Sequence, residues 1–352
     1  MGLELLVLSV NFFDLCLVPG AQGVNLFVFE SKNGVSTSAE GIELFETNCL
    51  IFNQSGALDK FKKIDEKIAY LPGYKTVDMA VKDKTLYLGA ISNNKLGLGL
   101  AKWTLKENGP VEISANPQFV TAFKLSDEQA ERVALDPAEG WSTMELPPEK
   151  WQFNSSIFLG QDKLMAVLNT ALADALLLEY SEKENSWREI ANIPCALEPK
   201  YIELGGRRLL ACRRPVGRWV VKSQSANYSI SAPQEGLLLD FVELDSSGKI
   251  LAQSKVKKPF GTDSTYIFDF TSDGKGRLAT ATVTGPKDKP LVAINISDDF
   301  GESWQKKGVV FLDDIPERLS LCITSEEAVV GMSFRVIDGY QIAVEQFPLK
   351  KD

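Results

Sequence analysis

The sequence of 352 residues contains no histidine. Histidine is the usual general base of serine and cysteine hydrolases, the commonest metal ligand in proteins and the one side chain whose ordinary pKa lies near neutrality. Its absence excludes Ser-His-Asp and Cys-His catalysis, zinc held by imidazole and a histidine pH switch.

Cysteine is also scarce. The sequence lacks a Cys-x-x-Cys pair, a Gly-rich phosphate loop, a dinucleotide fingerprint and a calcium-loop motif, so it predicts no cofactor and no metal. The cysteines are odd in number and widely spaced, which favours buried small apolar residues over a disulfide scaffold. They are Cys16, Cys49, Cys195, Cys212 and Cys322.

Basic charge is in short supply, because the net charge is −9 and the pI is near 4.9. A nucleic-acid binder needs a basic face for phosphate contacts, so no nucleic-acid partner is predicted. Among the few arginines, a local group lies between Arg207 and Arg218. This group predicts an anion-facing patch, with paired charges along an exposed strand as the alternative.

A strongly basic start is missing as well. The apolar run from Leu3 to Val18 has the length of a secretory signal, but no Lys or Arg precedes it and Glu4, Asn11 and Asp14 interrupt it. We therefore expect residues 1–23 to form a native strand, with a leader as the alternative. The run is too short and too polar to cross a bilayer, so no membrane span is predicted.

Four Asn-x-Ser sequons fit a secreted protein, although the motif arises often by chance. They leave a secreted or periplasmic location open, and the compartment stays unassigned. The four asparagines are Asn53, Asn154, Asn227 and Asn295.

What the sequence does contain is a recurring unit of short apolar strands and polar turns. One clear unit comprises Val77–Val81, Leu86–Ile91 and Leu98–Leu105. Similar units follow with a period of about 40 to 50 residues, which is typical of a β-propeller. No linker divides the chain. We predict an all-β fold in one domain over residues 1–352, with six four-stranded blades and seven blades as the alternative.

Two segments depart from the strand pattern. Between Leu58 and Leu71 the apolar residues have helical spacing, which predicts a short helix or a loop excursion. Ser126–Gln129 forms a capping-box start that Asp136-Pro137 closes, which predicts a helix inserted between strands.

One turn is unusually well specified. The alternating run Leu291–Ile296 leads into a polar turn in which an Asp can accept bonds from backbone amides, a Gly supplies positive φ and a Trp begins the return strand. The order Ser-x-Asp-x-Gly-x-x-Trp resembles the Asp-box, or bacterial neuraminidase repeat, of sialidase-type propellers. Ser297, Asp299, Gly301 and Trp304 fill its positions. The resemblance implies a structural turn away from the substrate face.

A kelch propeller is the competing type, because Tyr180–Trp187 resembles the kelch turn between tyrosine and tryptophan. The paired glycines that kelch repeats carry after the second strand are absent from Leu164–Asn169. The sialidase type is therefore preferred.

A second resemblance to the sialidase superfamily covers Glu198–Arg214. It implies that Glu198 assists a catalytic tyrosine and that Arg214 binds the substrate carboxylate, or Arg213 after a slip of one residue. The chemistry is consistent, since a guanidinium binds a carboxylate with two parallel hydrogen bonds and a carboxylate can serve as a base.

The sequence also departs from that family. The early Arg-Ile-Pro signature has no counterpart, because the first arginine is Arg132. Pro316–Ser320 stands where the nucleophilic Tyr-Ser is expected. Tyr340, with Arg335 five residues before it, is a substitute for that nucleophile, and a buried strand tyrosine is the alternative. A standard sialidase is not predicted.

Two functions remain. The chain is either a glycoside hydrolase of the sialidase superfamily or a propeller that binds a glycan or a protein without catalysis, so enzyme activity stays open. In both cases the ligand is expected in an Arg/Glu-lined central funnel. The candidates are Glu198 and Tyr340 for catalysis and Arg213, Arg214 and Arg335 for binding.

Overall fold

The computed structural model describes most of the chain. The prediction of an all-β fold is confirmed, because the described residues form strands and turns and no helix. The predicted helix after Ser126 lies outside the described residues. These are residues 4–8, 11–19, 23–37, 43–54, 62–72, 75–82, 85–91, 97–104, 118–124, 154–160, 163–169, 175–184, 186–193, 196–215, 220–224, 227–231, 237–251, 255–261, 264–337 and 339–349.

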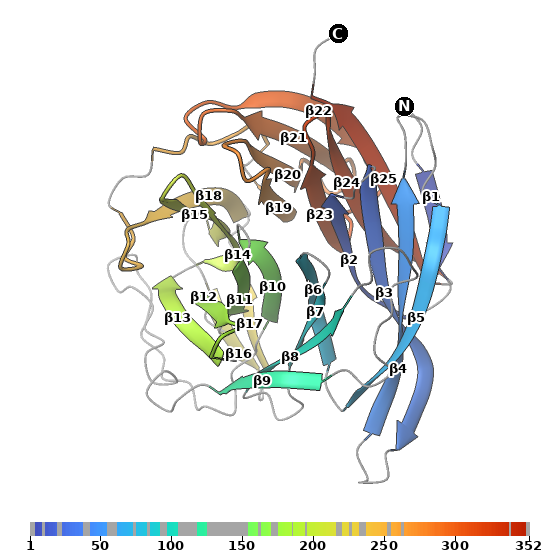
Figure 1. The fold of residues 1–352 in the computed structure, drawn as a ribbon. Coiled ribbons are helices and arrows are strands. Elements are labelled where there is room, and N and C mark those ends of the chain that lie inside the picture. The colour runs from blue at the N-terminus through green and yellow to red at the C-terminus, as the bar shows by residue number, and fades with distance from the viewer. Residues whose placement is uncertain are drawn as a thin grey trace.

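The described strands pair into antiparallel sheets, five with four strands, one with three and one with two (Figure 1). In chain order the strands are β1 (Glu4–Leu8), β2 (Asn11–Pro19), β3 (Val24–Thr37), β4 (Glu43–Gln54), β5 (Lys62–Pro72), β6 (Lys75–Lys82), β7 (Thr85–Ile91), β8 (Gly97–Thr104), β9 (Gln118–Lys124), β10 (Asn154–Gly160), β11 (Lys163–Asn169), β12 (Ala175–Ser181), β13 (Ser186–Ile193), β14 (Leu197–Leu204), β15 (Arg207–Pro215), β16 (Val220–Gln224), β17 (Asn227–Ser231), β18 (Leu237–Leu244), β19 (Ile267–Ser272), β20 (Leu278–Thr284), β21 (Leu291–Ser297), β22 (Gln305–Phe311), β23 (Arg318–Ile323), β24 (Glu327–Val336) and β25 (Gly339–Pro348).

Six of the sheets follow one another along the chain. They are β2–β5, β6–β9, β10–β13, β14–β15–β18, β19–β22 and β23–β25 with β1. The last sheet is completed by the start of the chain, because β1 pairs with β25 from Glu4 opposite Val344 to Leu8 opposite Tyr340. The remaining hairpin, β16–β17, is inserted between β15 and β18.

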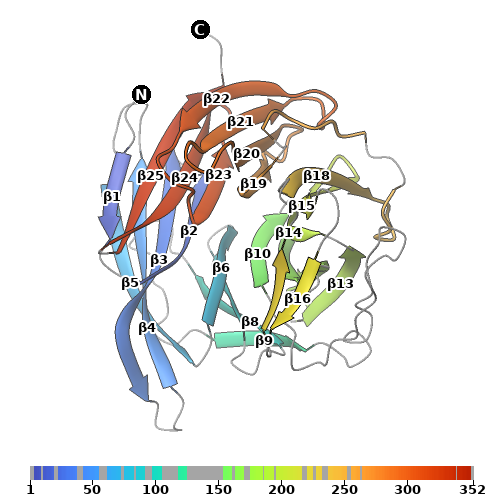
Figure 2. The ribbon, with the colours of Figure 1, turned by 180° about the vertical axis from the view of Figure 1, so that it is seen from behind.

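The first strands of the six sheets lie around a common centre (Figures 1 and 2). They contact one another in the cyclic order β2, β6, β10, β14, β19 and β23, and β23 contacts β2 again. Backbone groups join neighbours in this ring: Leu17 N donates to Ser320 Oγ at 3.0 Å and Leu321 N donates to Asp269 Oδ2 at 2.7 Å. Segments from both ends of the chain are thus adjacent at the centre.

Apolar side chains fill the space between neighbouring sheets. Between β19–β22 and the last sheet, for example, Val283, Ile294, Val330 and Met332 are fully buried. Every residue of β20 is buried, so this strand lacks the alternation of a half-exposed sheet because neighbours cover both of its faces. Truncating such a residue to alanine typically costs about 2 to 5 kcal/mol.

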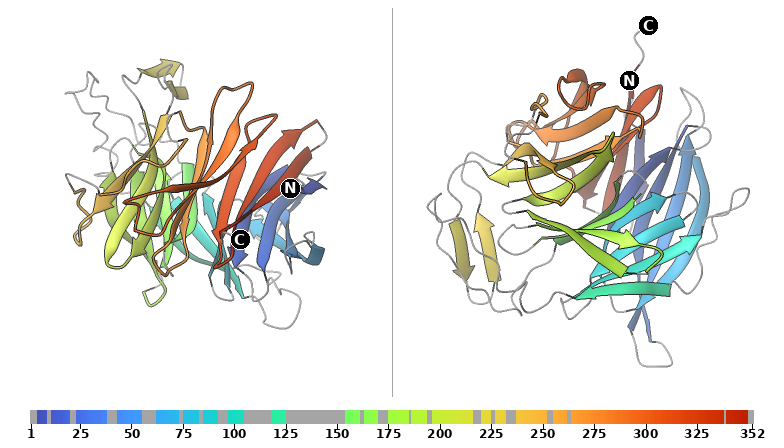
Figure 3. Two further views of the ribbon diagram at one scale, coloured as in Figure 1. Left: turned by 90° about the horizontal axis from the view of Figure 1, so that it is seen from above. Right: turned by 60° about the vertical axis from the view of Figure 1, so that its left-hand side comes forward.

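Strand direction defines two rims of the ring. Consecutive strands in each sheet are antiparallel. The first and third strands of each sheet therefore begin at the same edge of the ring, and the second strands end there. We call this edge the start rim. First and third strands end at the opposite rim. The β16–β17 hairpin connects the end of β15 to the beginning of β18 and therefore belongs to the start rim; Figure 3 shows it apart from the six sheets.

One sequence-based expectation is wrong. The helical spacing between Leu58 and Leu71 coincides with strand β5, whose residues pair with β4 over most of its length. Long-range pairing overrides a local pattern there.

No helix in the described part of the chain is long and apolar enough to cross a bilayer.

Candidate functional site

The start rim carries two polar clusters on neighbouring inner strands. The Glu198 cluster lies where β14, β15 and β19 meet, and the Tyr340 cluster lies where β2, β23, β24 and β25 meet. The members of the first are Glu198, Lys200, Arg213, Tyr266 and Asp269, and those of the second are Asp14, Glu317, Arg318, Arg335 and Tyr340.

Glu198 occupies an irregular position at the start of β14. The register with β15 shifts between Leu197 and Lys200, which indicates a β-bulge, and Glu198 itself has φ of +50°. Few residues other than glycine adopt this left-handed conformation, and bulges commonly redirect a side chain. Here the carboxylate Oε1 lies 2.8 Å from Arg213 Nη2.

Arg213 already has protein partners on two sides. Besides the ion pair with Glu198, its Nη1 donates a short hydrogen bond to the carbonyl of Tyr266, just before β19. Its Nε is buried and has no hydrogen-bond partner among the described residues. The guanidinium therefore links two sheets, and its two Nη groups are engaged before any ligand arrives.

Asp269 ties together three consecutive inner strands. Its Oδ1 lies 3.8 Å from Lys200 Nζ on β14, and its Oδ2 accepts the backbone N–H of Leu321 on β23. A carboxylate in contact with an ammonium and a backbone amide is held in one orientation. The Glu198 cluster is thus fixed to the strand that begins at the Tyr340 cluster.

The predicted arginine group does not form one patch. Arg207 and Arg208 begin β15 and so lie at the opposite rim, where Arg207 makes two hydrogen bonds to Glu243 at 2.9 and 3.1 Å. Arg213 ends β15 at the start rim. The backbone of Arg214 pairs with Leu238, but its side chain lies outside the description. Arg207 and Arg213 therefore lie near opposite ends of β15, a strand of nine residues.

Tyr340 lies near the start of β25 and is directly opposite Arg335 in the hairpin of β24 and β25. Its hydroxyl donates to the carboxylate of Glu317, immediately before β23. Arg318, the next residue, lies 3.9 Å from Asp14 on β2, measured between Nε and Oδ1. The cluster thus joins the last sheet to the first.

The electrostatics of Tyr340 keep its phenol protonated. Burial raises its pKa above the ordinary value, and the neighbouring carboxylate of Glu317 raises it further, while Arg335 and Arg318 lower it. The net pKa shift is upward. At neutral pH the group is therefore a neutral hydroxyl.

Arg335 is an exposed cation of this cluster, as is Arg318. The side chain of Arg335 is exposed, and it forms no ion pair or hydrogen bond with any described residue. Its charge nevertheless acts on the Tyr340 hydroxyl, so the guanidinium lies near it. Within the described part of the chain, the donor groups of Arg335 therefore have no acceptor.

The turn of Ser297 and Trp304 lies at the opposite rim, since it follows the third strand β21. Asp299 accepts hydrogen bonds from Ser297 Oγ and from the backbone and hydroxyl of Ser303, which lower its pKa to about 2. Gly301 has φ of +85°, and a Cβ there would lie 2.7 Å from Val256. Trp304 packs near Phe241 in the neighbouring sheet, with ring centroids 5.7 Å apart.

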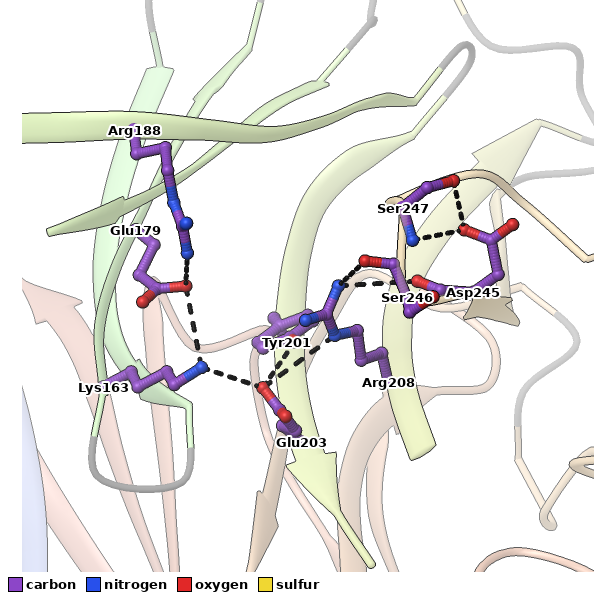
Figure 4. A network of polar contacts seen from close by, with 9 residues as sticks. All are labelled: Lys163, Glu179, Arg188, Tyr201, Glu203, Arg208, Asp245, Ser246 and Ser247. Atoms are coloured by element: carbon purple, nitrogen blue, oxygen red, sulfur yellow. Dashed lines mark hydrogen bonds and ion pairs between the residues drawn. The ribbon is translucent and has the colours of Figure 1, made fainter. Parts of the chain in front are cut away.

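A network of ion pairs at the same rim joins β10–β13 to the next sheet (Figure 4). Lys163 Nζ lies 3.1 Å from Glu203 and 3.7 Å from Glu179, and Arg188 pairs with Glu179 at 3.1 Å. Buried Tyr201 donates to Glu203, and its pKa is raised, first by burial and then by that carboxylate. The carboxylates here are neutralised by protein cations.

No protein-family model and no curated protein matches this chain. Among solved structures, Trypanosoma rangeli sialidase in complex with sialic acid matches with a TM-score of 0.58 at 11% identity, over 96% of this chain and 54% of that one. The chain has a sialidase-like β-propeller fold. The covalent intermediate of the same sialidase with 2,3-difluorosialic acid gives a TM-score of 0.57 at 11% identity, over 95% of this chain and 54% of that one.

The chain spans about half the length of these sialidase chains, and at this identity the likeness concerns the fold alone.

Sequence reasoning missed several residues of the propeller's start rim. These residues lie at or near the start of the first strand of a sheet. A charged residue near the start of the first strand in each repeat was the signal that could have identified them. Which of them meet depends on the ring, which no local pattern encodes. The missed residues are Asp14, Lys200, Asp269, Glu317 and Arg318.

Proposed function

We propose that this chain is a six-bladed propeller of the sialidase type that binds an acidic glycan at the start rim. The six consecutive sheets, whose first strands contact one another in cyclic order, support this blade count. Under the same proposal Ser297, Asp299, Gly301 and Trp304 form an Asp-box with a structural role.

The observation that carries the binding proposal is Arg335, an exposed guanidinium without a described protein partner beside the neutral hydroxyl of Tyr340. A guanidinium offers five N–H donors in a planar fork that matches a carboxylate. Tyr340 and Arg318 lie next to it. A ligand that brings a carboxylate gains charge-assisted hydrogen bonds there.

A sugar is the favoured carrier of that carboxylate. The cluster presents an exposed carboxylate acceptor, Glu317, close to its cations, and hydroxyl groups of a sugar are donors that suit such an acceptor. In this proposal Arg214, on the neighbouring blade, makes a further contact with the ligand. Arg213 and Glu198 have a structural role and fix the strands beside the site.

Glycoside hydrolysis is the second candidate. The hydrogen bond between Tyr340 and Glu317 favours it, because a carboxylate can remove the proton of an attacking tyrosine. The upward pKa shift of Tyr340 opposes it, since a nucleophile must be deprotonated. Binding without turnover is therefore the primary proposal.

The test is a glycan array with wild type, Arg335→Gln and the control Arg188→Gln, which removes an exposed arginine at the opposite rim. We expect wild type and the control to bind uronic or sialic acid glycans and Arg335→Gln to lose most of that signal. Failure of wild type to bind any acidic glycan would overturn the proposal and favour a protein-interaction scaffold.

Assays with chromogenic glycosides distinguish glycoside hydrolysis from binding without turnover. Cleavage by wild type that disappears in both Tyr340→Phe and Glu317→Gln would establish hydrolysis. Glycan binding without cleavage supports the primary proposal.

A further inference from the structure

The connection between β18 and β19 passes along the outside of the ring (Figure 1). Its residues 255–261, which we call the strap, are held against the outer strands of the β19–β22 sheet. Lys257 N donates to the carbonyl of Gly301, and the carbonyl of Lys257 accepts from Trp304 Nε1, both at 2.8 Å. Farther along, Asn295 Nδ2 donates to the carbonyl of Phe260 at 2.9 Å. The backbone of the strap is therefore fixed to the sheet beneath it.

Exposed apolar side chains are concentrated on this connection. Among the described residues six large apolar side chains are exposed, and three of them belong to it: Ile250 at 41%, Leu251 at 40% and Phe260 at 51%. Scattered apolar residues are common on protein surfaces, but a group of them bordered by charge marks an interaction surface. Lys306 Nζ lies 4.3 Å from the centroid of the Phe260 ring, a contact that holds the ring in its exposed position.

The same connection is basic, although the net charge of the chain is −9. Residues 249–261 contain four lysines and no acidic residue. Lys257, Lys258 and Lys306 are exposed, and none of the three forms an ion pair within the described part of the chain. We call these lysines together with Phe260 the strap patch. Charges more than about 8 Å away are largely screened at physiological ionic strength, so the patch presents local positive charge.

We propose that the strap patch binds an anionic lipid surface, so that the propeller associates with membranes through its outer side. Lysines suit mobile phosphate headgroups, because an ammonium is a compact point charge that requires no planar partner. Apolar side chains beside them enter the boundary between headgroups and acyl chains. An acidic peptide would engage the lysines but would leave Phe260 in water. The inference does not rest on the proposed function, since the Tyr340 cluster is at the start rim.

The test is sedimentation of the intact protein with vesicles of phosphatidylcholine alone or with an equal amount of phosphatidylserine. We expect wild type to sediment with the acidic vesicles only, and less as salt is added. Lys257→Gln/Lys258→Gln should weaken this binding by about 25-fold, because each lysine near an anionic surface contributes about fivefold. The matched control, Lys287→Gln/Lys289→Gln, removes two exposed lysines from the turn between β20 and β21 and should leave binding unchanged.

Phe260→Ser tests the apolar part of the patch. It should weaken binding to the acidic vesicles by roughly tenfold, because less apolar surface leaves water. Phe311→Ser is its control, since Phe311 is 76% exposed at the other end of β22 from Lys306. All substituted side chains are exposed, so urea midpoints close to that of wild type separate a loss of binding from a loss of folding.

Three outcomes overturn the inference: no sedimentation of wild type with acidic vesicles, an equal loss in a patch variant and its control, or tighter binding to soluble polyglutamate that Phe260→Ser leaves unchanged. The last outcome would identify an acidic peptide as the partner. The glycan array reports separately on the proposed function. Glycan binding without vesicle binding removes only this inference, whereas vesicle binding without glycan binding removes only the proposed function.

Discussion

The two rims of the ring use the same residue types in different ways. At the opposite rim, Glu179, Glu203 and Glu243 each have a protein cation as a partner. At the start rim, Glu198 has a left-handed backbone, and Arg335 is exposed without a described partner. Satisfied charges stabilise a fold, and strained or unsatisfied ones are what a ligand can use.

The comparison predicts that substitutions at the opposite rim change stability and that substitutions in the Tyr340 cluster change binding. Trp304→Ala should have the largest effect. It removes an aromatic side chain packed between two sheets and a hydrogen bond from Nε1 to the carbonyl of Lys257. We expect a loss of about 3 kcal/mol in the free energy of unfolding.

Urea denaturation measures this loss. Calorimetric titration with an acidic glycan, at a temperature where the variant is folded, should give the variant the same affinity as wild type. A midpoint equal to that of wild type would show that the tryptophan does not hold the turn.

Arg335→Gln should have the next largest effect, and on binding alone. Loss of a charge-assisted contact typically weakens affinity by about 10- to 100-fold. Because the side chain is exposed and has no described partner, the urea midpoint should stay within experimental error. A variant that is both weaker in binding and less stable would place Arg335 among the structural residues.

Arg213→Lys sharpens the comparison within the start rim. Lysine keeps the charge but cannot reach Glu198 and the Tyr266 carbonyl with one planar group. We expect a loss of about 1 kcal/mol in stability and a change in affinity smaller than that of Arg335→Lys. The reverse ranking, from parallel titrations of the two variants, would make Arg213 the anion-binding residue.

The smallest expected effect is on the pH dependence of stability, through Asp299, and it is confined to acidic pH. Hydrogen bonds from Ser303 and Ser297 lower its pKa in the folded state to about 2. An Asp in an unfolded chain titrates near pH 4, so this contribution to stability is complete above about pH 4 and is lost as the pH falls toward 2.

Asp299→Asn should therefore flatten the pH dependence of the melting temperature between about pH 4 and 2. Identical slopes for variant and wild type in that window would rule out this linkage.

Local patterns predicted what depends on neighbouring residues in sequence. The strand expected at Leu86–Ile91 is β7, and the one expected at Leu98–Leu105 is β8. The turn at Ser297 could be predicted because the side chains of Ser297 and Asp299 form their hydrogen bonds within the turn itself. Glu198 and Arg213 could be associated because one hairpin brings them together.

Contacts that close the ring could not be predicted in this way. Asp14 meets Arg318, and Tyr340 meets Glu317, only because the first and last sheets are neighbours. The segment expected as a short helix or a loop excursion contains strand β5, because a periodicity argument does not detect its pairing partner, β4. Tertiary placement, and not residue type, decided each of these cases.

The pairing of β1 with β25 has a mechanical consequence. Glu4 lies opposite Val344, so the chain enters and leaves this pair at the same end. Tension between the two termini therefore separates the strands progressively. The hydrogen bonds between β1 and β25 break one after another, from Glu4 toward Leu8. The inner strand β2 follows β1 in the chain, so a further pull on the ends acts on the contacts that β2 makes with β23, β24 and β25.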